Sequence, residues 1–308
     1  MNKHIMITGA NGGLGKEAAR QLALIPETEK IYLACRNATK AQAAKQSLEA
    51  ETGRSIFEIV IMDVSKPESV RNAVASLEDT VDALIMNAGG MGGKEPGELT
   101  SDGVTQMFAS NVLGHAVLLD ELVKADKLKN VALYAGSEAA RGVKKMGMKR
   151  PIMKNHTKEE FASVFDGSFF GKKYDPMEAY GFVKYVAALW MSSEARKHPN
   201  IRFITMSPGG TSGTSVMNDL PPLMRFAFKY LAVPIFMPLM GMIHKVEKGA
   251  ARYLDGISNQ SLRSGGFYGS KAAVLTGPVI DQSNIFPDLN NTAHQDNVKA
   301  AIERFISR

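Results

Sequence analysis

The chain has 308 residues, of which 44% are hydrophobic and 22% charged, with a formal net charge of +6 and a pI of about 9.2. These values are typical of a soluble globular protein with one large domain or two small ones. They favour a small anionic ligand and argue against nucleic-acid binding, because the one dense basic run, residues 141–150, lacks interleaved aromatic residues and is interpreted as a solvated loop.

The only cysteine, Cys35, excludes an intramolecular disulfide and favours a reducing compartment. The N-terminal residues lead directly into an apolar strand and have no signal-peptide pattern. The most apolar stretch, residues 230–244, is too short to span a bilayer and is interrupted by Pro234 and Pro238. We therefore expect a cytoplasmic protein, with peripheral membrane contact through residues 222–246 as an alternative.

Strand and helix patterns alternate along the chain. The predicted strands are 4–8, 30–35, 57–64, 82–87, 130–136, 201–207 and 265–269. Helical patterns between them include residues 39–51 and 67–78, and Ser65 with Glu68 predicts a capping box for the second. This alternation predicts an α/β fold with a parallel sheet, helices on both faces and right-handed crossovers, in one domain spanning residues 1–308.

Two segments interrupt this alternation. Residues 138–176 form a long polar insertion, and residues 212–246 are apolar and rich in methionine and proline. Segments of this length are usually lids or binding loops. We expect the second to cover a pocket for a small hydrophobic substrate. The alternative is that it packs in the ordinary way or forms a dimer interface. The expected oligomeric state is a monomer, a homodimer or a homotetramer. The candidate substrate residues are Met217, Leu220 and Phe226.

A glycine-rich turn follows the first predicted strand and opens a helix, within residues 7–23. Gly9 permits a tight turn, Gly13 allows the backbone to approach a pyrophosphate, and Gly15 allows close helix–strand packing. The helix N-terminus offers free N–H groups to phosphates. The position of this turn predicts a dinucleotide site.

The end of the second predicted strand indicates which dinucleotide binds. NAD sites usually place an acidic side chain there for the ribose hydroxyls, whereas this chain has Cys35 and Arg36. An arginine can pair with a 2′-phosphate. We therefore predict NADP(H) in preference to NAD(H); in the alternative, Arg36 only faces solvent. No histidine cluster with ligand spacing predicts a metal.

Polar residues fall on apolar faces of two predicted helices. Asn111 lies on the stripe of residues 101–123, where it either ties two strands together or orders a water or a backbone carbonyl near an active site. Tyr180 and Lys184 lie one helical turn apart. An ammonium beside a phenol is expected to lower the tyrosine pKa and make Tyr180 a proton donor or acceptor, unless Lys184 extends to solvent and Tyr180 fills the core.

Taken together, these motifs resemble the short-chain dehydrogenase/reductase family over nearly the whole chain. The matching stretches are TGANGGLG (8–15), LACR (33–36), DV (63–64), NAG (87–89), NVLGH (111–115), Ser137, YGFVK (180–184) and PG (208–209). The resemblance implies a single Rossmann-type doubly wound sheet of about seven strands in the order 3-2-1-4-5-6-7. The finer likeness is to the retinol dehydrogenase and protochlorophyllide reductase branches, although most compact members have fewer than the 43 positions between Ser137 and Tyr180 found here.

The resemblance also implies residue roles. Tyr180 is the general acid/base, Lys184 its electrostatic partner, Ser137 a donor to the substrate oxygen, and Asn111 the holder of a proton-relay water. The implied cofactor-binding residues are Gly9, Asn11, Gly13, Leu14, Gly15, Arg36, Asp63, Val64, Asn87, Ala88, Gly89, Tyr180, Lys184, Pro208, Gly209 and Thr211. The expected activity is NADPH-dependent interconversion of a bulky hydrophobic carbonyl and alcohol. The alternatives are alkene reduction, as in protochlorophyllide reductases, and NADPH binding without chemistry, as in a sensor or scaffold.

Overall fold

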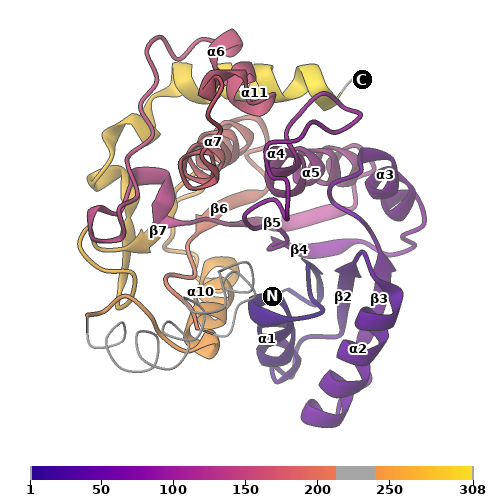
Figure 1. Ribbon diagram of the computed structural model, residues 1–308. Helices are drawn as coiled ribbons and strands as arrows, with labels where there is room; N and C mark the ends of the chain where they lie inside the picture. The colour runs from indigo at the N-terminus through magenta and orange to yellow at the C-terminus, as the bar shows by residue number, and fades with distance from the viewer. Residues whose placement is uncertain (1, 213–239, 307–308) are drawn as a thin grey trace.

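The computed structural model describes residues 2–212 and 240–306 (Figure 1). Within them, one eight-stranded sheet has the order β3-β2-β1-β4-β5-β6-β7-β8. All neighbouring strands are parallel except β7 and β8. The strands are β1 His4–Thr8, β2 Lys30–Cys35, β3 Phe57–Ile61, β4 Val81–Met86, β5 Leu128–Ala135, β6 Arg202–Met206, β7 Phe267–Ser270 and β8 Val279–Asp281. The predicted order of seven strands is confirmed, and β8 is an additional antiparallel edge strand that the sequence analysis missed.

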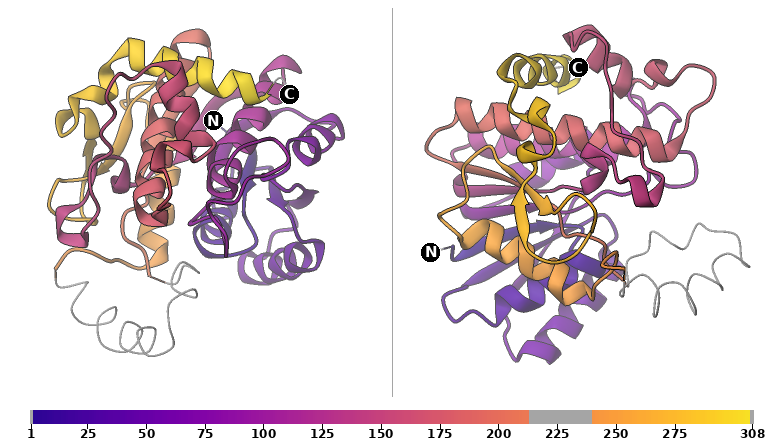
Figure 2. Two further views of the ribbon diagram at one scale, coloured as in Figure 1. Left: turned by 45° about the horizontal axis from the view of Figure 1, so that its top comes forward. Right: turned by 90° about the vertical axis from the view of Figure 1, so that its left-hand side faces the viewer.

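Helices cover both faces of this sheet (Figures 1 and 2). One face carries α1, α2 and α10, and the other carries α3, α5, α7 and α11. The helices are α1 Gly13–Ala23, α2 Ala38–Thr52, α3 Pro67–Ala75, α4 Gln106–Phe108, a π-helical turn Ala109–Leu113, α5 Gly114–Lys124, α6 Lys158–Phe165, α7 Pro176–Lys197, α10 Val246–Ser258 and α11 Thr292–Ile306.

Alternating side chains of the strands feed two separate cores. On β1, Ile5 and Ile7 pack with α1 and α10, whereas Met6 faces the core that contains α5 and α7. The same alternation directs Tyr134 of β5 toward α5 and α7. Because parallel strands are buried on both faces, these strands are continuous apolar runs.

Two local predictions about helix starts are wrong. Lys66, not Ser65, precedes α3 and no side chain caps it, because the Ser65 hydroxyl donates to the Asp63 carboxylate at 2.7 Å. The helix predicted over residues 101–123 begins only at Gln106, because the Thr105 side chain accepts from the Phe108 N–H and ends the preceding loop. The π-helical turn, which includes Asn111, then interrupts it.

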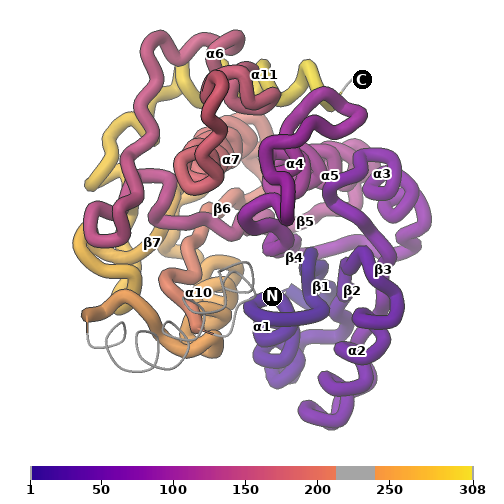
Figure 3. The backbone as a smooth tube through the Cα atoms, viewed as in Figure 1, coloured from indigo at the N-terminus to yellow at the C-terminus, as the bar shows by residue number. Residues whose placement is uncertain are grey.

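The insertion at residues 138–176 is partly ordered into helices. It contains α6 and three short 3₁₀ turns, Glu138–Arg141, Lys144–Met146 and Ser168–Phe170. Figure 3 traces it along the same side of the molecule as the C-terminal segment. The basic run within it is largely exposed, but Arg141 is buried, with its guanidinium donating to the Ser270 carbonyl, so the solvated-loop prediction fails for this residue.

The apolar segment predicted at residues 212–246 is described only at its two ends. Met217, Leu220 and Phe226 lie outside the described residues, as does most of the predicted membrane-contact segment 222–246. Among the described residues, no helix combines the length and apolar composition needed to cross a lipid bilayer.

Candidate active site

Helix α7 carries Tyr180 and Lys184 in its first three turns. Asp175 caps this helix by accepting from the backbone N–H groups of Met177 and Glu178, and Pro176 occupies its first position. The Lys184 Nζ atom lies 5.5 Å from the centre of the Tyr180 ring. The structure therefore brings the two predicted side chains to the same place.

Lys184 is buried and bonded to the end of β5. Its ammonium donates to the Tyr134 hydroxyl at 3.2 Å and to the Ala135 carbonyl at 3.0 Å. Burial lowers the pKa of Lys184 from 10.5 to about 7, because the low-dielectric surroundings disfavour the charged form. The alternative in which Lys184 extends to solvent is wrong, since this residue is only 5% exposed.

The protonation of Tyr180 differs from the prediction. Burial raises its pKa to about 12, while a hydrogen bond with Ser137 acts in the opposite direction. The expected lowering by Lys184 is absent from the protein alone, where burial has the largest effect on the pKa of this phenol. Tyr180 is therefore a protonated phenol at neutral pH.

Ser137 reaches Tyr180 despite the insertion between them. It follows β5 and precedes the 3₁₀ turn Glu138–Arg141, whose Ala139 N–H donates to the Ser137 hydroxyl oxygen at 3.2 Å. The chain leaves the sheet at this point and returns through α7, so the long separation in sequence does not separate the side chains.

Asn111 lies in the π-helical turn and is completely buried. Its side-chain amide accepts from the Gly90 N–H at 3.1 Å and donates to the Gly90 and Met107 carbonyls. Its own carbonyl accepts from Tyr134 and His115. The amide thus ties the loop after β4 to this helix, and π-helical turns occur frequently at functional sites. A relay water at Asn111 remains a prediction.

The glycine-rich turn joins β1 to α1. Gly9 has φ +68°, and a Cβ atom at Gly15 would lie 2.5 Å from the Gly9 carbonyl oxygen, so side chains are disfavoured at both positions. The Asn87 amide donates to the Thr8 carbonyl, and the Ala88 N–H donates to the Thr8 hydroxyl oxygen. These contacts fix the carboxyl ends of β1 and β4 together, at the switch point of the sheet where ligands bind in such folds.

Other predicted cofactor residues surround the same edge of the sheet. Arg36 is exposed immediately after β2. Asp63 and Val64 follow β3 and are partly buried, and the Asp63 carboxylate accepts from Ser65. Asn11 and Gly13 are exposed at the start of α1. The arrangement fits a dinucleotide with its phosphates at the N-terminus of α1 and its adenosine toward β2 and β3.

The chain after β6 is held by α10 and by the residues just before this helix. The Arg252 guanidinium donates to the Ser207 carbonyl, and the His244 ring bonds the Pro208 carbonyl at 2.7 Å. Gly209 has φ +75°. Thr211 lies close to α10, since a Cβ atom built at Gly249 would be 2.4 Å from its methyl group and 2.8 Å from Leu14. Leu14, Pro208 and Thr211 therefore gather around this helix.

Sequence reasoning missed two buried polar residues. Tyr134 bonds Lys184, and Glu138 accepts from the Ser207 hydroxyl and from the Ser270 N–H. Glu138 lies beside Ser137 and is 3% exposed. The detectable signal for Tyr134 was a phenol near the end of the apolar run of residues 131–135, on the face turned toward α7.

A cluster of His156, Asp288 and His294 joins the insertion to the C-terminal segment. Their ligand atoms lie within 4.8 Å of one another, a grouping that the sequence spacing did not predict. The two imidazole rings stack at 3.8 Å and 4°, and the Tyr185 hydroxyl donates to Asp288. Since a metal binds in the plane of an imidazole, two parallel rings do not converge on one ion. The cluster as arranged is a polar tie between the two segments.

Two surface hollows lie beside the edge strand β3. Their volumes are about 540 and 630 Å³, and they are lined by residues of β3, α2 and α3. Neither contains a predicted site residue, so neither matches the expected substrate pocket.

The sequence is similar to known oxidoreductases. Residues 3–133 match the family described as short chain dehydrogenase. The chain is 31% identical over 219 residues to dehydrogenase/reductase SDR family member 12 of Bos taurus, covering 70% of this chain and 63% of that protein. It is 38% identical over 130 residues to retinol dehydrogenase 13 of Homo sapiens, covering 41% and 38%. The match thus spans less than two thirds of both relatives.

A plant relative and a solved structure match more of the chain. The chloroplastic protochlorophyllide reductase of Daucus carota is 29% identical over 287 residues, covering 86% of this chain and 69% of that protein. A short chain dehydrogenase from Burkholderia cenocepacia J2315, in complex with NADP, superposes with a TM-score of 0.59 at 21% identity, covering 86% of this chain and 94% of that one. At this identity, the structural likeness supports the fold.

Proposed function

We propose that this chain, which is similar to short chain dehydrogenases over residues 3–133, is an NADPH-dependent oxidoreductase of that kind and interconverts a bulky hydrophobic carbonyl and its alcohol. The observation that carries the proposal is the convergence of three side chains beyond β5. Ser137 hydrogen-bonds Tyr180, and Lys184 lies one turn along the same helix, 5.5 Å from the Tyr180 ring.

The residues around the switch point support binding of a dinucleotide. The N–H groups at the start of α1 receive the phosphates, and Gly15 leaves space for close packing of helix and turn. Arg36 is free to pair with a 2′-phosphate because it is exposed at the end of β2. When bound, NADPH supplies the hydride. The NADP in the Burkholderia neighbour supports the same cofactor here.

The protein side chains supply the proton and stabilise the charge that remains. Tyr180, protonated at neutral pH, donates its phenolic proton to the substrate oxygen, while the Ser137 hydroxyl donates a hydrogen bond to that oxygen. The Lys184 ammonium stabilises the phenolate that remains. In the oxidising direction Tyr180 must first lose its proton, which its pKa of about 12 in the protein alone opposes.

Replacing Tyr180 with phenylalanine tests this role. Because Tyr180→Phe removes only the hydroxyl, NADPH should bind with unchanged affinity while turnover of a carbonyl substrate falls at least about 100-fold, within the range of general acid–base catalysis. The measurement is NADPH oxidation over a panel of aromatic and long-chain aldehydes and ketones, with NADH as a comparison for cofactor preference.

Tyr185→Phe is the matched control for this experiment. Tyr185 lies on the same helix, but its hydroxyl donates to Asp288, away from Ser137. This variant should keep wild-type turnover. Equal turnover of wild type and Tyr180→Phe would contradict the proposed chemistry.

Reduction of a carbon–carbon double bond is the second candidate. The similarity to carrot protochlorophyllide reductase extends over 86% of this chain. Both reactions would take a hydride from NADPH and a proton from Tyr180, so the product must distinguish them. An enone substrate, analysed by mass spectrometry and NMR, would yield a saturated ketone by alkene reduction and an allylic alcohol by carbonyl reduction. NADPH binding without oxidation over the full panel would instead indicate the sensor or scaffold alternative.

A further inference from the structure

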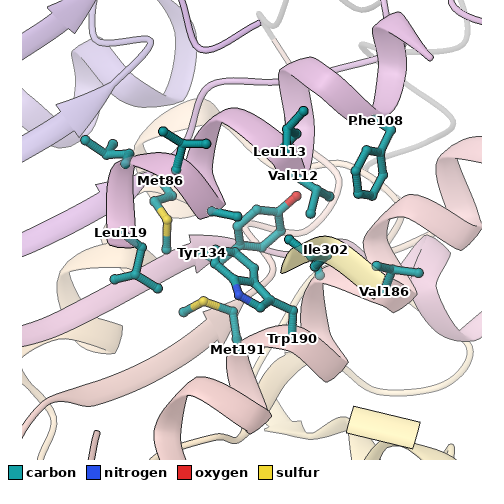
Figure 4. Packing of buried hydrophobic residues seen from close by; sticks show 14 of the residues in the cluster. Met86, Phe108, Val112, Leu113, Leu119, Tyr134, Val186, Trp190, Met191 and Ile302 are labelled. Carbon is teal, nitrogen blue, oxygen red and sulfur yellow. The ribbon is translucent and has the colours of Figure 1, made fainter. Parts of the chain in front are cut away.

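Tyr134 is a buried residue to which the family motifs assign no role. It lies at the carboxyl end of β5, is 1% exposed, and sits among apolar side chains of the π-helical turn and α7 (Figure 4). Its ring packs edge-on against Trp190, with 6.3 Å between ring centres. A buried hydroxyl in such surroundings is costly unless it is hydrogen-bonded on both sides.

The Tyr134 hydroxyl makes two hydrogen bonds with fixed directions. It accepts from the Lys184 ammonium at 3.2 Å and donates to the Asn111 carbonyl at 3.1 Å. An ammonium can only donate and a carbonyl can only accept, so the single phenolic proton must be directed toward Asn111. The lone pairs of Tyr134 are therefore available to Lys184.

Further hydrogen bonds hold the Asn111 carbonyl in place. His115 bonds this carbonyl through Nδ1 at 2.9 Å and the Thr8 hydroxyl through Nε2 at 3.0 Å. The Thr8 hydroxyl oxygen accepts from the Ala88 N–H, so its proton is free to be donated to His115. A neutral imidazole with its proton on Nδ1 satisfies every bond, and burial keeps His115 neutral by lowering its pKa to about 4.

We infer that Tyr134 is a positioning residue that holds the Lys184 ammonium charged and beside Tyr180, and that connects it through Asn111 and His115 to the glycine-rich turn. Its catalytic consequence rests on the proposed function. Lys184 has two hydrogen-bond acceptors here, the Tyr134 hydroxyl and the Ala135 carbonyl. Loss of the hydroxyl leaves one acceptor for a buried ammonium, which would then lose its proton more readily.

The surroundings contain no carboxylate bonded to Lys184 that could replace this hydroxyl, within the described residues. The ionisable groups that act on Tyr134 and Lys184 are Tyr180 from α7, His115 from α5 and Tyr253 from α10. Glu138 acts on Tyr180, and its carboxylate is bonded to Ser207 and Ser270. Within the described residues, Tyr134 is therefore the side chain that hydrogen-bonds the Lys184 amine.

The first test measures Lys184 directly and needs no activity. In protein with ¹³C-labelled lysine, the Lys184 NMR signal, assigned with Lys184→Arg, reports the pKa of the amine. Tyr134→Phe should move this pKa down by about one unit, the size expected for a lost hydrogen bond to a charged group. An unchanged pKa in a folded Tyr134→Phe protein would overturn the inference.

Tyr32→Phe is the matched control. Tyr32 lies on the same face of the sheet, is also 1% exposed, and its hydroxyl donates to Asp79, away from α7. This variant should leave the Lys184 pKa unchanged while losing a comparable buried-tyrosine hydroxyl. An equal pKa shift in both variants would mean a general effect of stability and would also overturn the inference.

The second test measures catalysis. Tyr134→Phe should lower kcat/KM for a carbonyl substrate roughly 10- to 100-fold without weakening NADPH binding. The loss of activity on raising the pH should begin at a lower pH than in wild type, because Lys184 then loses its proton earlier. Wild-type kcat/KM with a wild-type pH profile would contradict the role. If the wild-type protein reduces no carbonyl, the proposed function fails, whereas the NMR measurement still decides whether Tyr134 holds the charge of Lys184.

Discussion

Burial decides the charge of three neighbouring side chains at the candidate site. It lowers the pKa of Lys184 to about 7, raises that of Tyr180 to about 12 and lowers that of His115 to about 4. The sequence analysis considered only the mutual effect of Tyr180 and Lys184 and so predicted an acidic phenol. Desolvation is a property of the whole surroundings, which sequence spacing does not reveal.

The low pKa of His115 predicts a loss of stability in acid. The unfolded chain binds a proton at His115 below about pH 6.5, whereas the folded protein does so only near pH 4. The free energy of unfolding therefore decreases as the pH is lowered through this window. Between about pH 7.5 and pH 5 the loss from His115 alone is about 2 kcal/mol. Urea unfolding at both pH values measures it.

His115→Gln supplies the comparison for this pH effect. The variant removes the titrating group, so the difference in unfolding free energy between the two pH values should be smaller by about 2 kcal/mol than in wild type. Other histidines contribute equally to both proteins and cancel. The same pH dependence in both proteins would contradict a buried neutral His115.

At the scale of single elements, α7 determines where the proposed chemistry takes place. Its first turn is fixed by Asp175 and Pro176, and Tyr180 follows within five residues of this cap. Asp175→Ala should destabilise the protein by about 1 kcal/mol, because two N–H groups lose their acceptor. Asp175→Asn, which keeps a capping oxygen, should cost much less. Equal losses in the two variants by chemical denaturation would argue against this cap.

The accuracy of the sequence predictions differed between elements for physical reasons. The strands of the central sheet were found because buried parallel strands are continuous apolar runs, as in Lys30–Cys35. Val279–Asp281 was missed because three residues carry too little pattern. Ser65 resembled a capping residue, but a nearby carboxylate, Asp63, competed for its hydroxyl.

The candidate site was predictable as far as its motifs extend. Tyr180, Lys184 and Ser137 were named from the sequence, and the fold brings them together across the insertion. Tyr134 was not, because its role depends on the direction of a strand face relative to α7 and on the carbonyl of Asn111. Such contacts are tertiary and leave no spacing in the sequence.

At the scale of the molecule, the insertion is part of the core. Phe165 of α6 is completely buried, stacks on Phe108 at 4.0 Å and meets Phe305 of α11. Figure 2 shows α11 extending across α6 and α7. The insertion is therefore fastened on two sides, by the sheet-bound helices and by the end of the chain.

This packing predicts a large cost for one substitution. Phe165→Ala should lower the free energy of unfolding by roughly 3–5 kcal/mol, because it removes a buried ring and leaves a cavity. Ile152→Ala, in the same insertion but 75% exposed, should be nearly neutral. Urea denaturation compares the two variants with wild type. A loss below about 1 kcal/mol for Phe165→Ala would indicate an insertion that is not packed as described.

The fastening of α6 by α11 also constrains the order of events during synthesis. A ribosome delivers the chain from its N-terminus, so residues 138–176 emerge long before Thr292–Ile306. Until residues 288–305 have been made, Phe165 lacks its contact with Phe305, and His156 lacks both Asp288 and His294. The half of the sheet that contains β1 to β4 can assemble on the nascent chain, but the insertion completes its docking only once α11 has been made.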